Sequence, residues 1–164
     1  MPSVEDVEAF VPFFTDSQVM RFLGGETIPR DAVPEAIRRW IDDWRDNGVG
    51  KLVVEDRPGA VVGRVGTDVW DVRTWTQGTV ASADEAARPE LAWSLLRAHW
   101  GHGYATEAAS AFRDRIRGTG SVEGELISLV APANARSARV AGKLGATRGE
   151  TVAEGELDVW VHPR

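Results

Sequence analysis

Apolar residues recur at helical spacing in several parts of the chain. The strongest pattern runs over Pro29–Gly48, and the glycine at its end is a typical helix terminator. The apolar face of this helix carries Ala36, Ile37, Trp40, Ile41 and Trp44. The same spacing predicts further helices over Val4–Phe14, Tyr104–Arg117 and about Asn134–Leu144. Pro12 is expected to limit the first of them, and Thr15–Gly25 is expected to form a short helix or turn.

Short apolar runs between these helices predict strands. Gly50–Asp56 and Ala60–Trp70 flank a Pro-Gly turn, which indicates a hairpin. Further strands are predicted at Glu90–Leu96, Glu125–Ala131, Ala146–Val152 and Glu156–Pro163. Asp71–Arg88 is polar and irregular, so we expect a loop there with some strand around Trp75–Val80. Helices, a hairpin, and then strand–helix–strand–helix–strand predict one mixed α/β domain over residues 1–164, not a doubly wound sheet.

Composition narrows the classes of function. The chain has 164 residues, of which 43% are hydrophobic and 27% charged, as in an ordinary globular domain. It contains no cysteine, and its three histidines show no metal-ligand spacing, so we expect neither disulfides nor a metal site. A formal net charge of −6 argues against nucleic-acid binding. With no signal peptide and no membrane-spanning apolar run in the sequence, a cytoplasmic protein is expected.

The stretch WGHGYATEA, Trp100–Ala108, lies between a predicted strand and a predicted helix. Free backbone N–H groups and the helix dipole make such a turn suitable for an anion, usually a phosphate. Thr106 stands at the third glycine of the dinucleotide fingerprint, which argues against a Rossmann site, and a P-loop is excluded because no Gly-Lys-Ser/Thr follows. Taken alone, the turn leaves open a purely structural role and phosphate binding.

A second stretch, NARSARVAGKLGA over Asn134–Ala146, follows the next predicted strand and begins with a helix-capping residue. Together the two stretches resemble the GNAT superfamily of N-acyltransferases, in its RimJ/RimL-like branch. Members carry a WGxGYATEA-like turn after the fourth strand and an NxxSxxVxxKLGF-like segment after the fifth. The matching residues are Trp100, Gly101, Gly103, Tyr104, Ala105, Thr106, Glu107, Ala108, Asn134, Ser137, Val140, Lys143, Leu144 and Gly145.

This resemblance implies a mostly antiparallel central sheet, flanked by helices and splayed between strands four and five, with acetyl-CoA or another acyl-CoA bound in the gap. The pyrophosphate would rest on the turn, which makes cofactor-binding candidates of Gly101, His102, Gly103, Tyr104, Ala105 and Thr106. The pantetheine arm would contact strand four and the second motif, through Trp93, Ser94, Leu95, Leu96 and Asn134. Catalysis would be direct attack of an amine on the thioester.

Several positions depart from the pattern of the family. Ala98 stands where members often have Gln or Arg, and Ala141 stands where many have the tyrosine that protonates the leaving thiolate. Ala146 replaces the usual Phe. The usual first strand is not evident, because the sequence starts almost at the first helix. We therefore expect an exposed sheet edge, which could recruit a second subunit to make a homodimer, with a monomer as the alternative.

The resemblance also gives catalytic candidates. Glu90 begins strand four and is the candidate base, acting through a water; alternatively it binds substrate or solvent. Ser137 is the branch's alternative proton donor, although it could instead cap a helix or face solvent. Weaker acidic candidates are Asp84, Glu85 and Glu107. The tryptophans that could wall an acceptor pocket, or pack in the core, are Trp70, Trp75 and Trp93.

These observations lead to an N-acyltransferase that moves an acetyl group from CoA to a primary amine. Similarity to the RimJ/RimL-like branch suggests a protein N-terminal α-amine as acceptor, and small amines are the other acceptor class. Two alternatives of a different kind stay open: a non-catalytic domain that senses acyl-CoA, and a nucleotide-phosphate binder that uses the glycine turn.

Overall fold

The computed structural model describes residues 1–119 and 124–164. Its strands form a seven-stranded sheet in the order β1-β2-β4-β5-β7-β6, with β3 paired to β2. The strands are β1 Lys51–Glu55, β2 Val61–Asp71, β3 Thr76–Gly78, β4 Ala87–Leu95, β5 Ile127–Val130, β6 Thr147–Val152 and β7 Leu157–Val161. Neighbouring strands are antiparallel except β4 and β5, which are parallel. The predicted mixed, mostly antiparallel sheet is confirmed.

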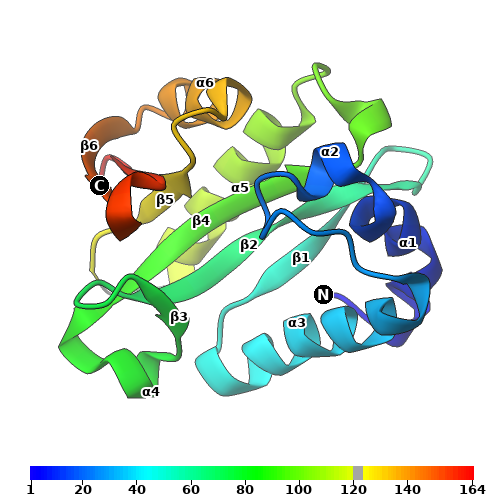
Figure 1. The fold of residues 1–164 in the computed structure, drawn as a ribbon, viewed down its shortest axis with the longest axis horizontal. Coiled ribbons are helices and arrows are strands. Elements are labelled where there is room, and N and C mark those ends of the chain that lie inside the picture. The colour runs from blue at the N-terminus through cyan, green and yellow to red at the C-terminus, as the bar shows by residue number, and fades with distance from the viewer. Residues whose placement is uncertain (120–123) are drawn as a thin grey trace.

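Helices cover both faces of this sheet (Figure 1). They are α1 Val7–Thr15, α2 Ser17–Met20, α3 Val33–Asn47, α4 Val80–Ala83, α5 Tyr104–Thr119 and α6 Ala135–Lys143. One core joins α1, α2 and α3 through residues such as Phe10, Met20 and Trp40. A second core packs α5, through Phe112, against Leu91 of β4. No helix among the described residues is long and apolar enough to cross a bilayer.

The first helix continues through Pro12 to Thr15, so the expected limit at this proline is wrong. A proline inside a helix removes one backbone hydrogen bond. Here the adjoining turn is held by tertiary packing, because Phe10, Phe13 and Phe14 are buried and stack around the ring of Trp40. The helix α3 ends as predicted, at Gly48 in the left-handed conformation with φ 65°.

The polar region after β2 is more ordered than a loop. The strand β3 falls within the predicted Trp75–Val80 stretch, but α4 follows it and was not predicted. This short helix is fixed by a capping box, in which Thr79 and Ser82 each accept a hydrogen bond from the other's backbone N–H. The strand β4 then begins at Ala87 rather than Glu90, because β2 extends to Asp71 and pairs with it there.

The sheet splays between β4 and β5. These strands share a single partner pair, Glu90 with Ile127, and diverge beyond it. Side chains replace the missing ladder at the apex: the Ser128 hydroxyl donates to the Leu91 carbonyl at 2.5 Å, and the Leu129 N–H donates to the Glu90 carboxylate at 3.4 Å. No strand precedes β1 among residues 1–50, so β1 forms one edge of the sheet.

Candidate active site

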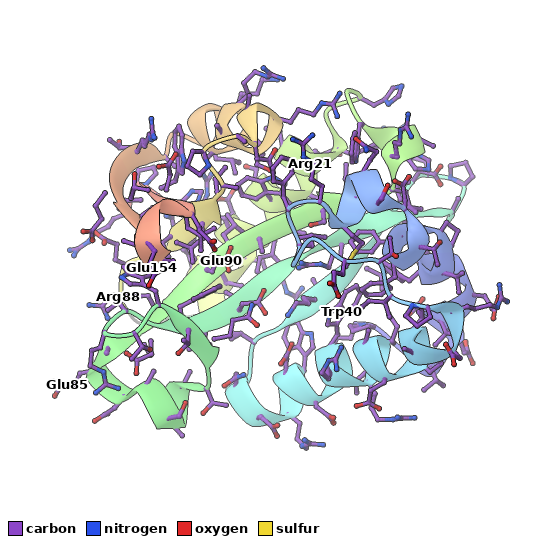
Figure 2. The ribbon with its side chains drawn as sticks, viewed as in Figure 1. Arg21, Trp40, Glu85, Arg88, Glu90 and Glu154 are labelled. Carbon is purple, nitrogen blue, oxygen red and sulfur yellow. The ribbon has the colours of Figure 1, made fainter. Side chains whose placement is uncertain are left out.

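The splay opens into a cavity of about 710 Å³ that runs between the sheet, α2 and α6. Most of the site residues predicted from the sequence line this cavity. They are Glu90, Trp93, Ser94, Leu95, Gly101, Gly103, Tyr104, Ala105, Thr106, Asn134 and Ser137. The exceptions are Leu96, which packs against the core of α1–α3, and His102, whose side chain is exposed on the turn. Figure 2 shows Glu90 on β4 toward the interior, and Glu85 at the periphery.

The turn before α5 presents unused hydrogen-bond donors to the cavity. Gly101 and Gly103 have φ values of 84° and 91°, which favour glycine, and a Cβ at either position would meet only open space. None of the backbone N–H groups from Gly101 to Ala105 donates to another described residue. The Thr106 N–H, expected among these donors, is instead used in the first helical turn, where it bonds to the Gly103 carbonyl. The remaining donors and the start of a long helix suit an anion.

The backbone edge of β4 also faces the cavity. The Leu91 carbonyl accepts a hydrogen bond from the Ser128 hydroxyl, and the Leu95 carbonyl accepts one from the indole N–H of Trp100. Both carbonyls therefore point away from β2. Peptide groups alternate in direction along a strand, so Trp93, midway between these residues, turns its N–H the same way. No residue of β5 pairs with Trp93 in the described chain, and this N–H is therefore available to a ligand.

Asn134 stands opposite this edge, at the start of α6. Its side-chain oxygen caps the helix by accepting the Ser137 N–H at 3.2 Å. Its amide nitrogen donates to no other described residue, so the same side chain can cap the helix and still bind a ligand. Ser137 contributes only its backbone N–H to this cap and is a half-buried residue of the cavity lining, so the expected alternative of a capping serine is wrong.

Glu90 lies at the apex of the splay, where it is 8% exposed. Its carboxylate accepts a 2.5 Å hydrogen bond from the indole N–H of Trp70. Burial, and then the charge of Asp68 across the strands, raise the pKa of Glu90 from 4.5 to about 7. The Trp70 hydrogen bond and the charge of Arg64 act against this rise in pKa without cancelling it. A carboxyl group that titrates near neutrality in a cavity is suited to proton transfer.

Two charged residues of this cavity, Arg64 and Asp68, were not identified from the sequence. Both belong to β2, on the face that Glu90 shares. The buried Lys51 forms an ion pair with Asp68 and a second one with Asp43, in which the N–O distance is 3.0 Å. One buried cation thus bridges two carboxylates. The sequence does contain a signal for them, because both are charged residues inside an otherwise apolar strand. An ionised residue at a buried strand position needs a partner or a ligand.

The aromatic candidates divide between the cavity and the core. Trp70 and Trp93 line the cavity. Trp75 packs instead against the C-terminal strands, in a cluster with Ile127, Val152 and Val159. The described residues contain no group of three or more His, Asp or Glu side chains that could hold a metal ion.

Comparison with known proteins agrees with this arrangement. The family description "Acetyltransferase (GNAT) domain" matches residues 1–147. The uncharacterized protein YkkB of Bacillus subtilis is 28% identical over 170 residues, covering all of this chain and 88% of that protein. An acetyltransferase from Agrobacterium tumefaciens superposes with a TM-score of 0.76 at 24% identity, over 99% of this chain and 87% of that one. The aminoglycoside acetyltransferase AAC(6')-Ib, solved with coenzyme A, gives 0.76 at 16% identity, over 99% and 91%.

Proposed function

Because the chain belongs to the GNAT acetyltransferase family, we propose that its cavity binds acetyl-CoA and that Glu90 prepares an acceptor amine for acetylation. The protein is an N-acetyltransferase. The observation that carries the finer proposal is the position of Glu90: a buried carboxyl group, poised to titrate near neutral pH, lies in the same cavity as the free N–H groups of the glycine turn. One part of this cavity suits an anion, and the other suits the handling of a proton.

The residues present fit coenzyme A. The unpaired N–H groups from Gly101 to Ala105 and the start of α5 would hold the pyrophosphate, as helix N-termini hold phosphates elsewhere. The amide nitrogen of Asn134 would bind the pantetheine arm from one side of the gap, and the open backbone edge of β4 would face the arm from the other side. Basic side chains on α6, among them Arg136 and Lys143, also line the cavity and favour negative charge.

When bound, acetyl-CoA supplies a thioester, whose C–S bond breaks as the amine nitrogen forms a bond with the carbonyl carbon. An ammonium ion has no free electron pair, so the acceptor must first lose a proton. Glu90 takes that proton, directly or through one water, and its raised pKa makes it a sufficiently strong base. Trp70 fixes the orientation of the carboxylate.

Two further groups would act on the carbonyl oxygen and on the sulfur of the thioester. Negative charge develops on the carbonyl oxygen, and the Trp93 N–H is the donor we assign to it. The amine nitrogen loses a second proton as it becomes an amide, and the departing thiolate takes up a proton; Ser137, which lines the cavity from α6, would relay this proton from nitrogen to sulfur through its hydroxyl. In this role Ser137 takes the place of the tyrosine that many relatives have where this chain has Ala141.

The proposal is tested by thiol release from acetyl-CoA with a panel of primary amines, which includes small amines and peptides with a free N-terminus. We expect thiol release that depends on the amine, and a kcat lowered roughly 10²- to 10⁴-fold in Glu90→Gln with CoA affinity unchanged. A change confined to the acceptor KM would make Glu90 a binding residue rather than a base. Tight CoA binding without turnover would indicate a sensor, and displacement of CoA by ATP a nucleotide-phosphate site.

A further inference from the structure

Arg64 is a buried cation without a partner on the floor of the cavity. The residue is 8% exposed, and its Nε and Nη1 are buried with no hydrogen-bond partner in the described part of the chain. The guanidinium lies over the ring of Trp40 at 5.4 Å, a contact that occupies its face and leaves its N–H donors free. An arginine keeps its charge and its donors inside a protein, so this arrangement is costly unless something binds them.

The position of Arg64 relates it to the base. In the register of β2 and β4, Arg64 lies opposite Ser94 and Asp68 lies opposite Glu90, so all of these side chains share one face of the sheet. Arg64 and Asp68 are four residues apart on β2, a separation of about 13 Å between their Cα atoms. The floor of the cavity therefore has an unpartnered cation at one end and the candidate base at the other.

Between these ends, the side chains of the cavity floor are small. Gly66 and Ala92 are the cross-strand pair halfway along it, and the larger of them contributes a methyl group. The opposite wall of the cavity is mostly apolar, with Val19, Phe22 and Leu23 from the segment that contains α2, and Gln18 is the polar side chain of that segment that joins them. The space is thus bounded mainly by apolar groups along its length and by opposite charges at its ends.

We propose that the acceptor is a small amine that also carries a carboxylate, with its amine facing Glu90 and its carboxylate bound by Arg64. This inference rests on the proposed function, because Glu90 defines the amine end. A carboxylate satisfies the guanidinium in both charge and hydrogen bonding, which a neutral amide does only in part. The protein N-terminal α-amine is correspondingly disfavoured, since the carboxyl group beside that amine is part of a peptide bond.

The first experiment compares acceptors on the wild-type protein. For each of several amino acids of increasing distance between amine and carboxylate, kcat/KM is measured for the acid, its carboxamide and the amine that lacks the carboxyl group. We expect the acid with the best spacing to exceed its carboxamide by roughly 10- to 100-fold, the scale of a charge-assisted hydrogen bond. Equal values for acid and carboxamide at every spacing, or a preference for peptides, would overturn the inference.

The second experiment assigns the preference to Arg64. Arg64→Met keeps much of the stem over Trp40 but removes the charge, and we expect it to abolish the ratio of acid to carboxamide mainly through the KM of the acid. Arg64→Lys keeps the charge and should retain part of the ratio. Arg21→Met is the matched control, because Arg21 also lies over an aromatic ring, that of Phe22, but is exposed at the end of α2 (Figure 2). An unchanged ratio in a folded Arg64→Met protein would refute the role of Arg64.

CoA binding, measured by calorimetry on each variant, separates the possible failures. If the wild type binds CoA but acetylates no amine, the proposed function fails. If it acetylates amines without regard to a carboxylate, the proposed function stands and the inference about Arg64 is wrong. If Arg64→Met does not fold, the Arg64→Lys ratio and the wild-type acceptor series still decide the question.

Discussion

Asp68 and Glu90 lie directly opposite one another on β2 and β4, so two carboxyl groups share one face of the sheet at the apex of the splay. Their surroundings differ. Asp68 is ion-paired with the buried Lys51, whereas Glu90 accepts neutral hydrogen bonds from Trp70 and the Leu129 backbone. Burial is the main cause of the raised pKa of Glu90, and the charge of Asp68 raises it further by favouring the protonated form. These two effects together set the pH at which the candidate base becomes available.

We expect kcat/KM to rise with pH through about 7 and then to level, as Glu90 loses its proton in the free enzyme. Trp70→Phe removes a hydrogen bond that favours the carboxylate, so the pKa of Glu90 and the acidic limb should move to higher pH. Asp68→Asn removes a neighbouring negative charge and should move the limb to lower pH. The measurement is the pH profile of kcat/KM at constant ionic strength; shifts in the same direction for both variants would contradict this assignment.

Glu90 should also lower the stability of the folded protein at high pH. Its folded pKa of about 7 lies above its ordinary value of 4.5, so the folded state binds the proton more tightly, and stability falls as pH rises through this interval. The cost above pH 7 is at most about 3 kcal/mol. We therefore expect Glu90→Gln to raise the Tm at pH 8 and to have a smaller effect at pH 4.5. The measurement is thermal unfolding of both proteins at the two pH values; an equal shift at both would show that the charge is not the cause.

Gly103→Asp should abolish CoA binding while the fold is kept, because it places a carboxylate beside the donors that we assign to the pyrophosphate. Gly155→Asp is a closely matched control: Gly155 has φ 95° against 91° for Gly103, and a Cβ at either meets nothing within 4 Å. Both variants place an aspartate at nearly the same positive φ, so we expect their Tm to fall by similar amounts. Calorimetric titration with CoA would then distinguish them, and equal affinities would place the phosphates elsewhere.

Substitutions of Asn134 separate its two roles. Asn134→Ser retains an oxygen that can cap α6 but removes the amide donor, so CoA affinity should fall by about 1 kcal/mol with little loss of stability. Asn134→Ala removes the cap as well and should lower the free energy of unfolding by a further ~1 kcal/mol. Chemical denaturation and CoA titration give both quantities. Wild-type CoA affinity in the serine variant would leave Asn134 with the capping role alone.

Periodicity identified the long elements of the fold, since the apolar faces of α3, α5 and α6 each repeat over several turns. It did not predict α4, whose single turn is held by Thr79 and Ser82 rather than by an apolar face. The continuation of α1 through Pro12 depends on burial of Phe13 and Phe14 against Trp40. Trp40 is distant in the sequence, so the residues around Pro12 do not predict this contact.

The candidate site divides in the same way. Residues within one short segment, such as Gly101, Gly103 and Asn134, could be proposed from motifs because their roles depend on local backbone. Arg64 and Asp68 could not, because their relation to Glu90 depends on the register between β2 and β4. The alternation along a strand predicts the face on which a charged residue lies. The identity of the residue opposite it on the neighbouring strand is known only from the tertiary structure.

The single pair that joins β4 to β5 also bears on solubility. A strand edge without a partner usually invites another protein chain to add to it, which is a common route to aggregation. Here the open edge at Trp93 lies inside a cavity, between the sheet and α6, where a slender amide-bearing arm fits more readily than a second folded sheet. The domain can thus keep an unpaired strand edge for its ligand, while the cavity prevents other copies of the chain from pairing with that edge.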